Sequence, residues 1–237
     1  MKRYIPYLYL LLCVACGGTT DAKLPKQSPN DNIQPQTVRG FMVETAESVD
    51  KKTLIDAKSW GANVVRLQLN PLSYAIKRKR NFWEAFPDYL KLVQTKIDDA
   101  RQVGLKVVVD LHEPPMMDGD KAPTSTKQGT EAFWENPELK TNFIRMWKEI
   151  ATKFKSSKYN DVIWGYDLFN EPQINWKHPP KQWLEMSPEL VATVRAIDKD
   201  VWIVYQSGLN NDEYKTYEPL KDKRVIYSVH FYKPFGF

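Results

Sequence analysis

Cysteine is almost absent from this chain: two occur among its 237 residues, as Cys13 and Cys16. We expect Cys13 to be removed with an N-terminal signal, which leaves Cys16 as the only thiol. The folded part then has no disulfide, no thiolate zinc site and no cysteine nucleophile. No other pattern of metal ligands stands out, so we predict no bound metal.

Charge of one sign is also scarce. The net charge is +5, part of it carried by the first three residues, and no basic stripe or arm follows, so nucleic acid is not an expected partner. The sequence has no G-x-G-x-x-G after its first strand and no G-x-x-x-x-G-K-[ST], which excludes the usual dinucleotide and nucleotide folds. With 42% hydrophobic and 27% charged residues, the composition is that of a single globular domain.

Long hydrophobic runs are missing, and the longest one lies at the N-terminus. Lys2 and Arg3 precede "YIPYLYLLLCVAC", which is too short for a membrane span and is typical of a signal peptide. Small residues flank Cys16, as in bacterial lipoprotein signals in which the cysteine is lipidated, although Cys13 stands where such signals usually carry leucine. An ordinary secretory signal cleaved nearby is the alternative.

We therefore predict a lipoprotein-type signal peptide over residues 1–16 with Cys16 as the lipidation site. Residues 17–37 are polar and hold hardly any large apolar side chain, so we expect a disordered tether. These features place the protein in the bacterial cell envelope, lipid-anchored or secreted, at the outer membrane, in the periplasm or at the cell surface. The lipid would be its only attachment to a membrane.

From Val38 onward, short apolar segments alternate with amphipathic ones. We expect strands over 38–44, 62–69, 105–112, 161–169, 201–208 and 224–232, and helices over 48–61, 88–104, 136–154 and 187–200. The last two helices would begin at Asn136 and Ser187, each a capping residue followed by proline. Strands that are apolar on both faces indicate a parallel sheet covered by helices, in a doubly wound sheet or a (β/α)8 barrel.

Polar side chains gather where these strands end: Glu44, Arg66, His112, Glu113, Asn170, Glu171, Tyr205, Gln206, His230 and Tyr232. In a barrel, the carboxyl ends of the strands form the mouth that carries the chemistry. Each residue alone has an ordinary structural explanation, since a lone histidine is often a satisfied structural group and a buried arginine is often an ion-pair partner. Their common position favours a functional site.

Five segments in order, "RGFMVE", "NVVRLQL", "VVVDLHEPP", "WGYDLFNEP" and "YSVHFYKP", resemble glycoside hydrolase family 5, the cellulase and mannanase family. The resemblance covers nearly all of residues 38–237. It implies an α/β fold, a (β/α)8 TIM barrel with about six of its eight βα units present. It also implies hydrolysis of O-glycosidic bonds in a β-linked polysaccharide by a retaining double displacement, without a cofactor, in a protein that is monomeric when complete.

The resemblance implies roles for six residues. Glu171 matches the acid/base, Asn170 the amide that contacts the sugar 2-hydroxyl, and Arg66 the arginine that orients the nucleophile. Three others line the site: His112, His230 and Tyr232. A glutamate that must be protonated at neutral pH needs a raised pKa, which an aromatic and partly desolvated pocket would supply.

In this family the nucleophile is a glutamate at the end of the seventh strand, and this sequence stops at Phe237, after the sixth. We therefore expect the domain at 38–237 to lack its last two βα units and its nucleophile, and to hydrolyse little or nothing. Glu44, Asp110 and Glu113 lie near the mouth, but the family gives none of them that role. The alternative is a non-catalytic glycan-binding surface lipoprotein.

The sequence does not select among cellulose, mannan, xyloglucan and mixed-linkage glucan as the substrate. Several tryptophans outside the strands are candidates for stacking on sugar rings, although core packing is the expected role of most of them: Trp83, Trp134, Trp176 and Trp183.

Overall fold

The computed structural model describes residues 35–115, 131–173, 180–206 and 219–230. The signal peptide with Cys16 and most of the tether lie outside these ranges, as do Trp176 and Tyr232, so the proposals about them stay predictions. Within the described ranges, no helix has the length and apolar character needed to cross a bilayer.

Six parallel strands form one sheet whose spatial order follows the chain. They are β1 (Gly40–Val43), β2 (Val64–Leu69), β3 (Lys106–Leu111), β4 (Ile163–Asp167), β5 (Trp202–Gln206) and β6 (Val225–Ser228). A doubly wound sheet reverses its strand order at a switch point, and this one does not. The order 1-2-3-4-5-6 is therefore that of a (β/α)8 barrel with six of its strands, which confirms the predicted fold class.

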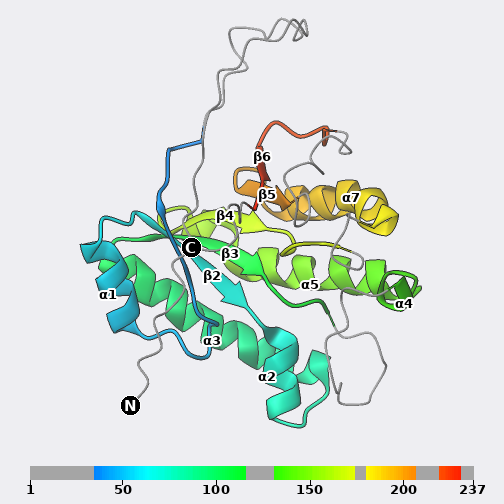
Figure 1. The fold of residues 1–237 in the computed structure, drawn as a ribbon, viewed down its shortest axis with the longest axis horizontal. Coiled ribbons are helices and arrows are strands. Elements are labelled where there is room, and N and C mark those ends of the chain that lie inside the picture. The colour runs from blue at the N-terminus through cyan, green and yellow to red at the C-terminus, as the bar shows by residue number, and fades with distance from the viewer. Residues whose placement is uncertain (1–34, 116–130, 174–179, 207–218, 231–237) are drawn as a thin grey trace, which may run out of the picture.

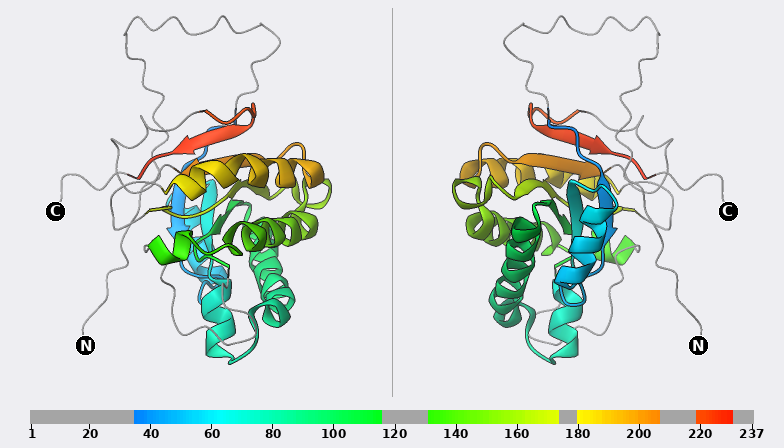
Figure 2. Two further views of the ribbon diagram at one scale, coloured as in Figure 1. Left: turned by 90° about the vertical axis from the view of Figure 1, so that its right-hand side faces the viewer. Right: turned by 90° about the vertical axis from the view of Figure 1, so that its left-hand side faces the viewer.

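Helices cover one side of the strands. The long ones are α1 (Lys51–Ser59), α3 (Phe82–Val103), α5 (Leu139–Phe154) and α7 (Lys181–Ile197), and the short ones are α2 (Pro71–Lys77), α4 (Glu131–Trp134) and α6 (Ser156–Tyr159). In Figure 1 the long helices follow one another around the outside of the strands. Figure 2 shows β6, drawn in red, at one border of this arrangement beside α7.

Helix α1 begins at Lys51 rather than at Ser48, and α3 ends at Val103, next to the predicted Gly104. The Asp50 side chain accepts a hydrogen bond from the backbone N–H of Thr53 at 2.7 Å and so caps α1. Gly104 ends α3 in the left-handed region, with φ of 76°, where glycine carries no Cβ penalty.

Other helix starts differ from the prediction. Helix α3 begins at Phe82 rather than Asp88, because the Asn81 side chain caps it by accepting from the N–H of Trp83 at 2.9 Å. Helix α5 begins at Leu139 rather than Asn136, although the Asn136 side chain does accept from the backbone N–H at position 138, at 2.9 Å.

The prediction that Ser187 caps the helix before Pro188 was wrong. Helix α7 begins at Lys181, and the Ser–Pro pair lies in its interior. The Ser187 hydroxyl donates to the carbonyl of Trp183 at 2.5 Å, one turn earlier. Because the Trp183 side chain is fully buried in the helical layer, packing holds this first part of the helix in place despite the proline.

The two faces of the sheet differ. Side chains on the outer face of the strands, such as Val65, Leu67 and Val109, join the large core under the helices. The inner face holds a smaller apolar cluster of Val38, Val64, Val108, Trp164 and Val204.

Two residues further along each of three strands, the inner face becomes polar, at Arg66, Asp110 and Gln206. A β-bulge at the pairing of β3 with β4 sets the inward register of β4, which brings Asp167 to the same level. The barrel interior is therefore apolar near the start of the strands and charged near their carboxyl ends.

Candidate active site

Arg66 is the centre of a buried polar network at the carboxyl ends of the strands. Its side chain donates to Asp167 Oδ2 at 2.9 Å, to Asp110 Oδ1 at 2.8 Å and to Asn170 Oδ1 at 2.9 Å. Burial would lower the pKa of Arg66, but the charges of Asp110 and Asp167 outweigh it and raise that pKa. The guanidinium therefore stays charged and fixes three side chains at the ends of two strands, β3 and β4.

The two aspartates in this network are completely enclosed. Burial raises the pKa of Asp167 to about 6, with the Arg66 charge opposing and the Asp110 charge adding to the shift. The folded chain therefore binds this proton more tightly than the unfolded chain does. The contribution of Asp167 to stability accordingly falls as the pH rises from about 4 to about 6, because its ionised form is the costly one.

Glu171 follows β4 in an unusual backbone conformation, with φ of 46°, in the left-handed region that residues other than glycine rarely adopt. Its backbone N–H donates to Gln206 Oε1 at 2.8 Å. Its carboxylate Oε1 lies 2.6 Å from His230 Nδ1, and the two side chains are 17% and 14% exposed. The structure thus brings together Glu171 and His230, whose positions differ by 59 residues.

His112 lies beside the same network. Its Nδ1 is 2.8 Å from Asp110 Oδ2, and its side chain is 25% exposed. Because Asp110 also accepts from Arg66, its carboxylate is the acceptor here and His112 Nδ1 carries the hydrogen.

Five of the six residues predicted for the site lie in the described part, and they form two linked groups. Arg66 contacts Asn170 directly and His112 through Asp110, whereas Glu171 contacts His230.

Other residues expected at strand ends do not join the site. Glu44 is exposed, and the Glu113 carboxylate accepts from the backbone and hydroxyl of Ser73 in the first turn of α2. Tyr205 faces the helical layer and stacks on Trp183, with ring centroids 5.7 Å apart.

The tryptophans described outside the strands pack in or on the helical layer. Trp134 and Trp183 are buried, and the ring of Trp83 lies under the guanidinium of Arg145 at 3.9 Å. Burial therefore prevents Trp134 and Trp183 from stacking on a sugar, and Arg145 covers one face of the Trp83 ring.

Sequence reasoning gave no role to two residues of the network, Asp167 and Gln206. Gln206 Nε2 donates to Asp167 Oδ2 at 2.7 Å, and both side chains are buried. A charged residue inside an otherwise apolar strand was the available signal for Asp167, since such a group is buried only with a partner.

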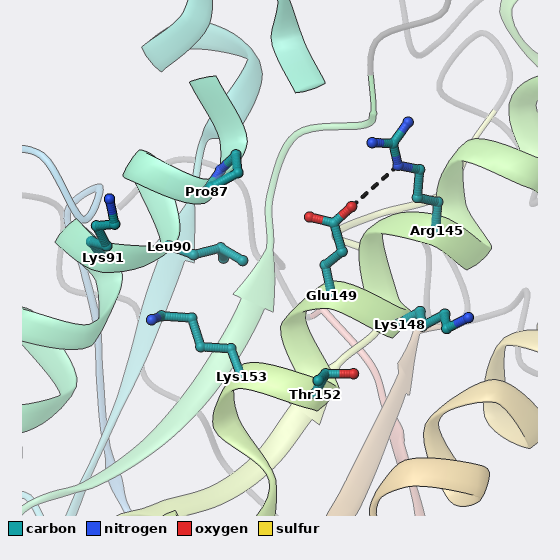
Figure 3. Close-up of a pocket in the computed structure, with 8 residues that line it drawn as sticks. All are labelled: Pro87, Leu90, Lys91, Arg145, Lys148, Glu149, Thr152 and Lys153. Atoms are coloured by element: carbon teal, nitrogen blue, oxygen red, sulfur yellow. Dashed lines mark hydrogen bonds and ion pairs between the residues drawn. The ribbon is translucent and has the colours of Figure 1, made fainter. Parts of the chain in front are cut away.

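A separate groove of about 590 Å³ lies between α3 and α5, as Figure 3 shows. None of the polar strand-end residues lines it. Arg145 is paired with Glu149 at 3.1 Å, and Lys91 is paired with Asp88 at 3.0 Å. Lys148 points away from Lys91 in the close-up, so the cations do not converge on one point.

Among the described residues, no group of three or more histidine, cysteine, aspartate or glutamate side chains is arranged to hold a metal ion. The chemistry that these residues offer is that of carboxyl groups, amides and imidazoles.

Polar side chains gathered at the carboxyl ends of parallel barrel strands lie where a (β/α)8 enzyme carries its chemistry. The family model described as cellulase (glycosyl hydrolase family 5) matches residues 28–237. The chain therefore belongs to glycosyl hydrolase family 5.

Curated relatives agree with the family. Cellodextrinase A of Ruminococcus flavefaciens is 28% identical over 180 residues, covering 75% of this chain and 49% of the relative. Endoglucanase C of Acetivibrio thermocellus is 26% identical over 192 residues, covering 79% of this chain and 50% of the relative. The chain thus spans about half the length of the curated relatives that it matches.

Solved structures share the fold. Endoglucanase Cel5A from the hyperthermophilic Thermotoga maritima matches with a TM-score of 0.59 and 24% identity, covering 79% of this chain and 54% of the other.

Proposed function

We propose that this chain carries the acid/base half of a retaining β-glycan hydrolase, with Glu171 as the acid/base. The observation that carries the proposal is the placement of Glu171: its backbone is held in a left-handed conformation, and its partly exposed carboxyl group lies against His230 beside Asn170. In the first step Glu171 gives its proton to the leaving glycosidic oxygen, and in the second it takes a proton from the attacking water.

Asn170 supports this role through its orientation. Its Oδ1 accepts from Arg66, so its amide hydrogens are directed away from the guanidinium. We assign them to the 2-hydroxyl of the sugar, a hydrogen bond that strengthens in the transition state. Arg66, His112, His230 and Tyr232 complete the substrate site in this proposal.

The proposed substrate is a β-1,4-linked glucan or its oligosaccharides. The relatives are named cellodextrinase and endoglucanase, and Thermotoga maritima Cel5A has been solved with cellobiose and with mannotriose. A β-mannan is therefore the second substrate to test. We also propose, from the sequence signal alone, that Cys16 anchors the protein in the bacterial envelope.

The nucleophile is the open part of the mechanism. A retaining enzyme needs a second carboxylate about 5 to 5.5 Å from the first. Asp110 and Asp167 are bound to Arg66, and Glu113 is bound to Ser73, so none of the three is free to attack an anomeric carbon. We propose that these groups do not replace the nucleophile and that the chain alone hydrolyses little.

An aryl glycoside assay on the full chain tests the acid/base role of Glu171 and the proposal that none of these carboxylates replaces the nucleophile. Azide serves as an external nucleophile: it attacks the anomeric carbon, the bond to the aryl oxygen breaks, and the phenol leaves. Dinitrophenol leaves without protonation, whereas phenol needs the proton of Glu171. We expect azide to accelerate cleavage of 2,4-dinitrophenyl and phenyl β-cellobioside. We expect Glu171→Gln to lower only the phenyl rate, by about 10² to 10⁴-fold.

Glu149→Gln on the outer surface of α5 is the matched control and should change neither rate. Equal losses on both substrates in Glu171→Gln would sink the acid/base assignment. A full rate that needs no azide would show that another group of this chain acts as the nucleophile.

A glycan-binding role is the second candidate, and the engagement of Asp110, Asp167 and Glu113 favours it. Calorimetry with cellotetraose separates the two functions. Saturable binding with no product, with or without azide, would support the binding protein over the enzyme.

A further inference from the structure

Gln206 connects two parts of the site, the Arg66 network and the backbone of Glu171. It ends β5 on the inner face and is fully buried. Its amide has two functions at once: Nε2 donates to Asp167 Oδ2 at 2.7 Å, and Oε1 accepts from the backbone N–H of Glu171 at 2.8 Å. Only a side chain with a donor and an acceptor on one planar group makes both bonds.

These bonds close a ring around the end of β4. From Glu171 the ring passes through Gln206 to Asp167, from Asp167 to Arg66 at 2.9 Å, and from Arg66 to Asn170 Oδ1 at 2.9 Å. Asn170 and Glu171 are neighbours in the chain, so the ring holds both from opposite sides.

Glu171 needs such support because of its backbone. A φ of 46° is costly for a residue with a Cβ atom, and a conformation of this kind persists only where its surroundings hold it. The Gln206 side chain engages this backbone directly, because its Oε1 accepts from the Glu171 N–H. Loss of that bond would let the peptide relax and carry the carboxyl group away from its place beside His230.

We propose that Gln206 is a positioning residue that holds the Glu171 backbone in its left-handed conformation and thereby aims the Glu171 carboxyl group at the glycosidic oxygen. The proposal rests on the acid/base role proposed for Glu171. It adds that a side chain of the neighbouring strand β5 sets the orientation of the Glu171 carboxyl group. The amide of that side chain is also hydrogen-bonded to Asp167 of the Arg66 network.

Two substitutions separate positioning from mere filling of space. Gln206→Met keeps the approximate size and removes both bonds. Gln206→Glu keeps the shape, and its new carboxyl group makes both bonds only while it shares a proton with Asp167, because two ionised carboxylates face each other without a hydrogen between them. The other charged groups around Asp167 are Arg66 of β2 and Asp110 of β3, with His112, Glu171 and His230 at the mouth.

The kinetic test uses the full chain with azide and phenyl β-cellobioside. Gln206→Met should lower kcat by about 10² with little change in KM, as a misplacement near 1 Å does. The ratio of kcat for Gln206→Glu to kcat for the wild type should be highest at acid pH and should fall as the pH rises. Gln102→Glu, on the exposed surface of α3, adds the same charge elsewhere and should give a constant ratio.

A second measurement does not depend on activity. Amide hydrogen exchange at Glu171, followed by NMR, should be at least about tenfold faster in Gln206→Met than in the wild type, because the N–H loses its acceptor. In Gln206→Glu at acid pH the protection should return. Thermal unfolding of each variant shows that the comparison is made on folded protein.

The outcomes are distinct. If the wild type cleaves no glycoside under any condition, the proposed function fails, and the exchange data still decide whether Gln206 holds Glu171. Unchanged Glu171 exchange in Gln206→Met, a change confined to KM, or a pH-independent ratio for Gln206→Glu would each overturn the positioning role.

Discussion

At the scale of single residues, Arg66 is the group on which the interior of the barrel mouth depends. It forms ion pairs with two enclosed carboxylates and also donates to the amide oxygen of Asn170. Removing one partner of a buried ion pair leaves an uncompensated charge, which costs far more than the net strength of the pair. The same side chain therefore has a structural role and a role in the site.

Arg66→Met should lower the free energy of unfolding by about 3 to 5 kcal/mol at pH 8, measured by urea denaturation. The loss should be smaller at pH 5, because the pKa of Asp167 is raised to about 6 and the neutral acid needs no cation.

Arg78→Met is the control for that substitution. Arg78 pairs with Glu47 at the surface, where its side chain is 40% exposed, so its loss should stay within about 1 kcal/mol. Similar losses for the two arginines, or a loss for Arg66→Met that does not change with pH, would contradict this account.

At the scale of elements, the approach of β1 to β2 depends on a glycine. Gly40 pairs with Val64, and a Cβ atom at Gly40 would lie 1.7 Å from the carbonyl oxygen of Val64. Backbone cannot move aside as a flexible side chain does, so the two strands would have to separate.

Gly40→Ala should therefore destabilise the fold by about 3 kcal/mol or more, since even modest overpacking costs about 1 to 3 kcal/mol. Gly104→Ala is the comparison. The nearest atom to a Cβ at Gly104 would be 3.8 Å away, so the cost of this substitution comes from the left-handed φ alone, at about 1 to 2 kcal/mol. Thermal unfolding of both variants measures which substitution costs more stability. A larger loss of stability for Gly104→Ala than for Gly40→Ala would contradict the close approach of β1 to β2.

At the scale of the whole molecule, burial is uneven across the sheet. All of β4 is buried, and β3 is buried except at its first residue, whereas β6 is only partly covered and Tyr227 is 46% exposed. Strands with few buried contacts open at lower free energy than those in the core.

Hydrogen exchange followed by mass spectrometry should therefore show slow exchange in peptides from β3 and β4 and markedly faster exchange in peptides from β6. The difference follows from burial, because both groups of strands make parallel hydrogen-bonded ladders. Equal protection of β4 and β6 would show that β6 is covered by contacts beyond those described.

Most of the fold was predictable because its signals are local. Apolar strands alternating with amphipathic helices indicate a parallel sheet, and capping residues such as Asp50 and Gly104 lie at the ends of their helices. The start of α7 was not predictable, because the Ser187–Pro188 pair has a strong local preference that burial of Trp183 overrides.

The candidate site was predictable as a set of polar residues at strand ends, because each of them directly follows or ends an apolar segment of the sequence. Its wiring was not. Bonds such as Arg66 to Asp167 and Glu171 to His230 join residues 101 and 59 positions apart, and no local pattern specifies such a distance.

The sequence by itself determined the family, the alternation of strands and helices along the chain and the presence of Asn170 and Glu171 after the fourth strand, because residue spacing and strand polarity are properties of the chain. Only the tertiary structure decided that Gln206 reaches Glu171, that Asp167 shares Arg66 with Asp110, and that Tyr205 turns to the helices. The physical reason is that a hydrogen bond depends on where two side chains meet in space, which strand register fixes and sequence spacing does not.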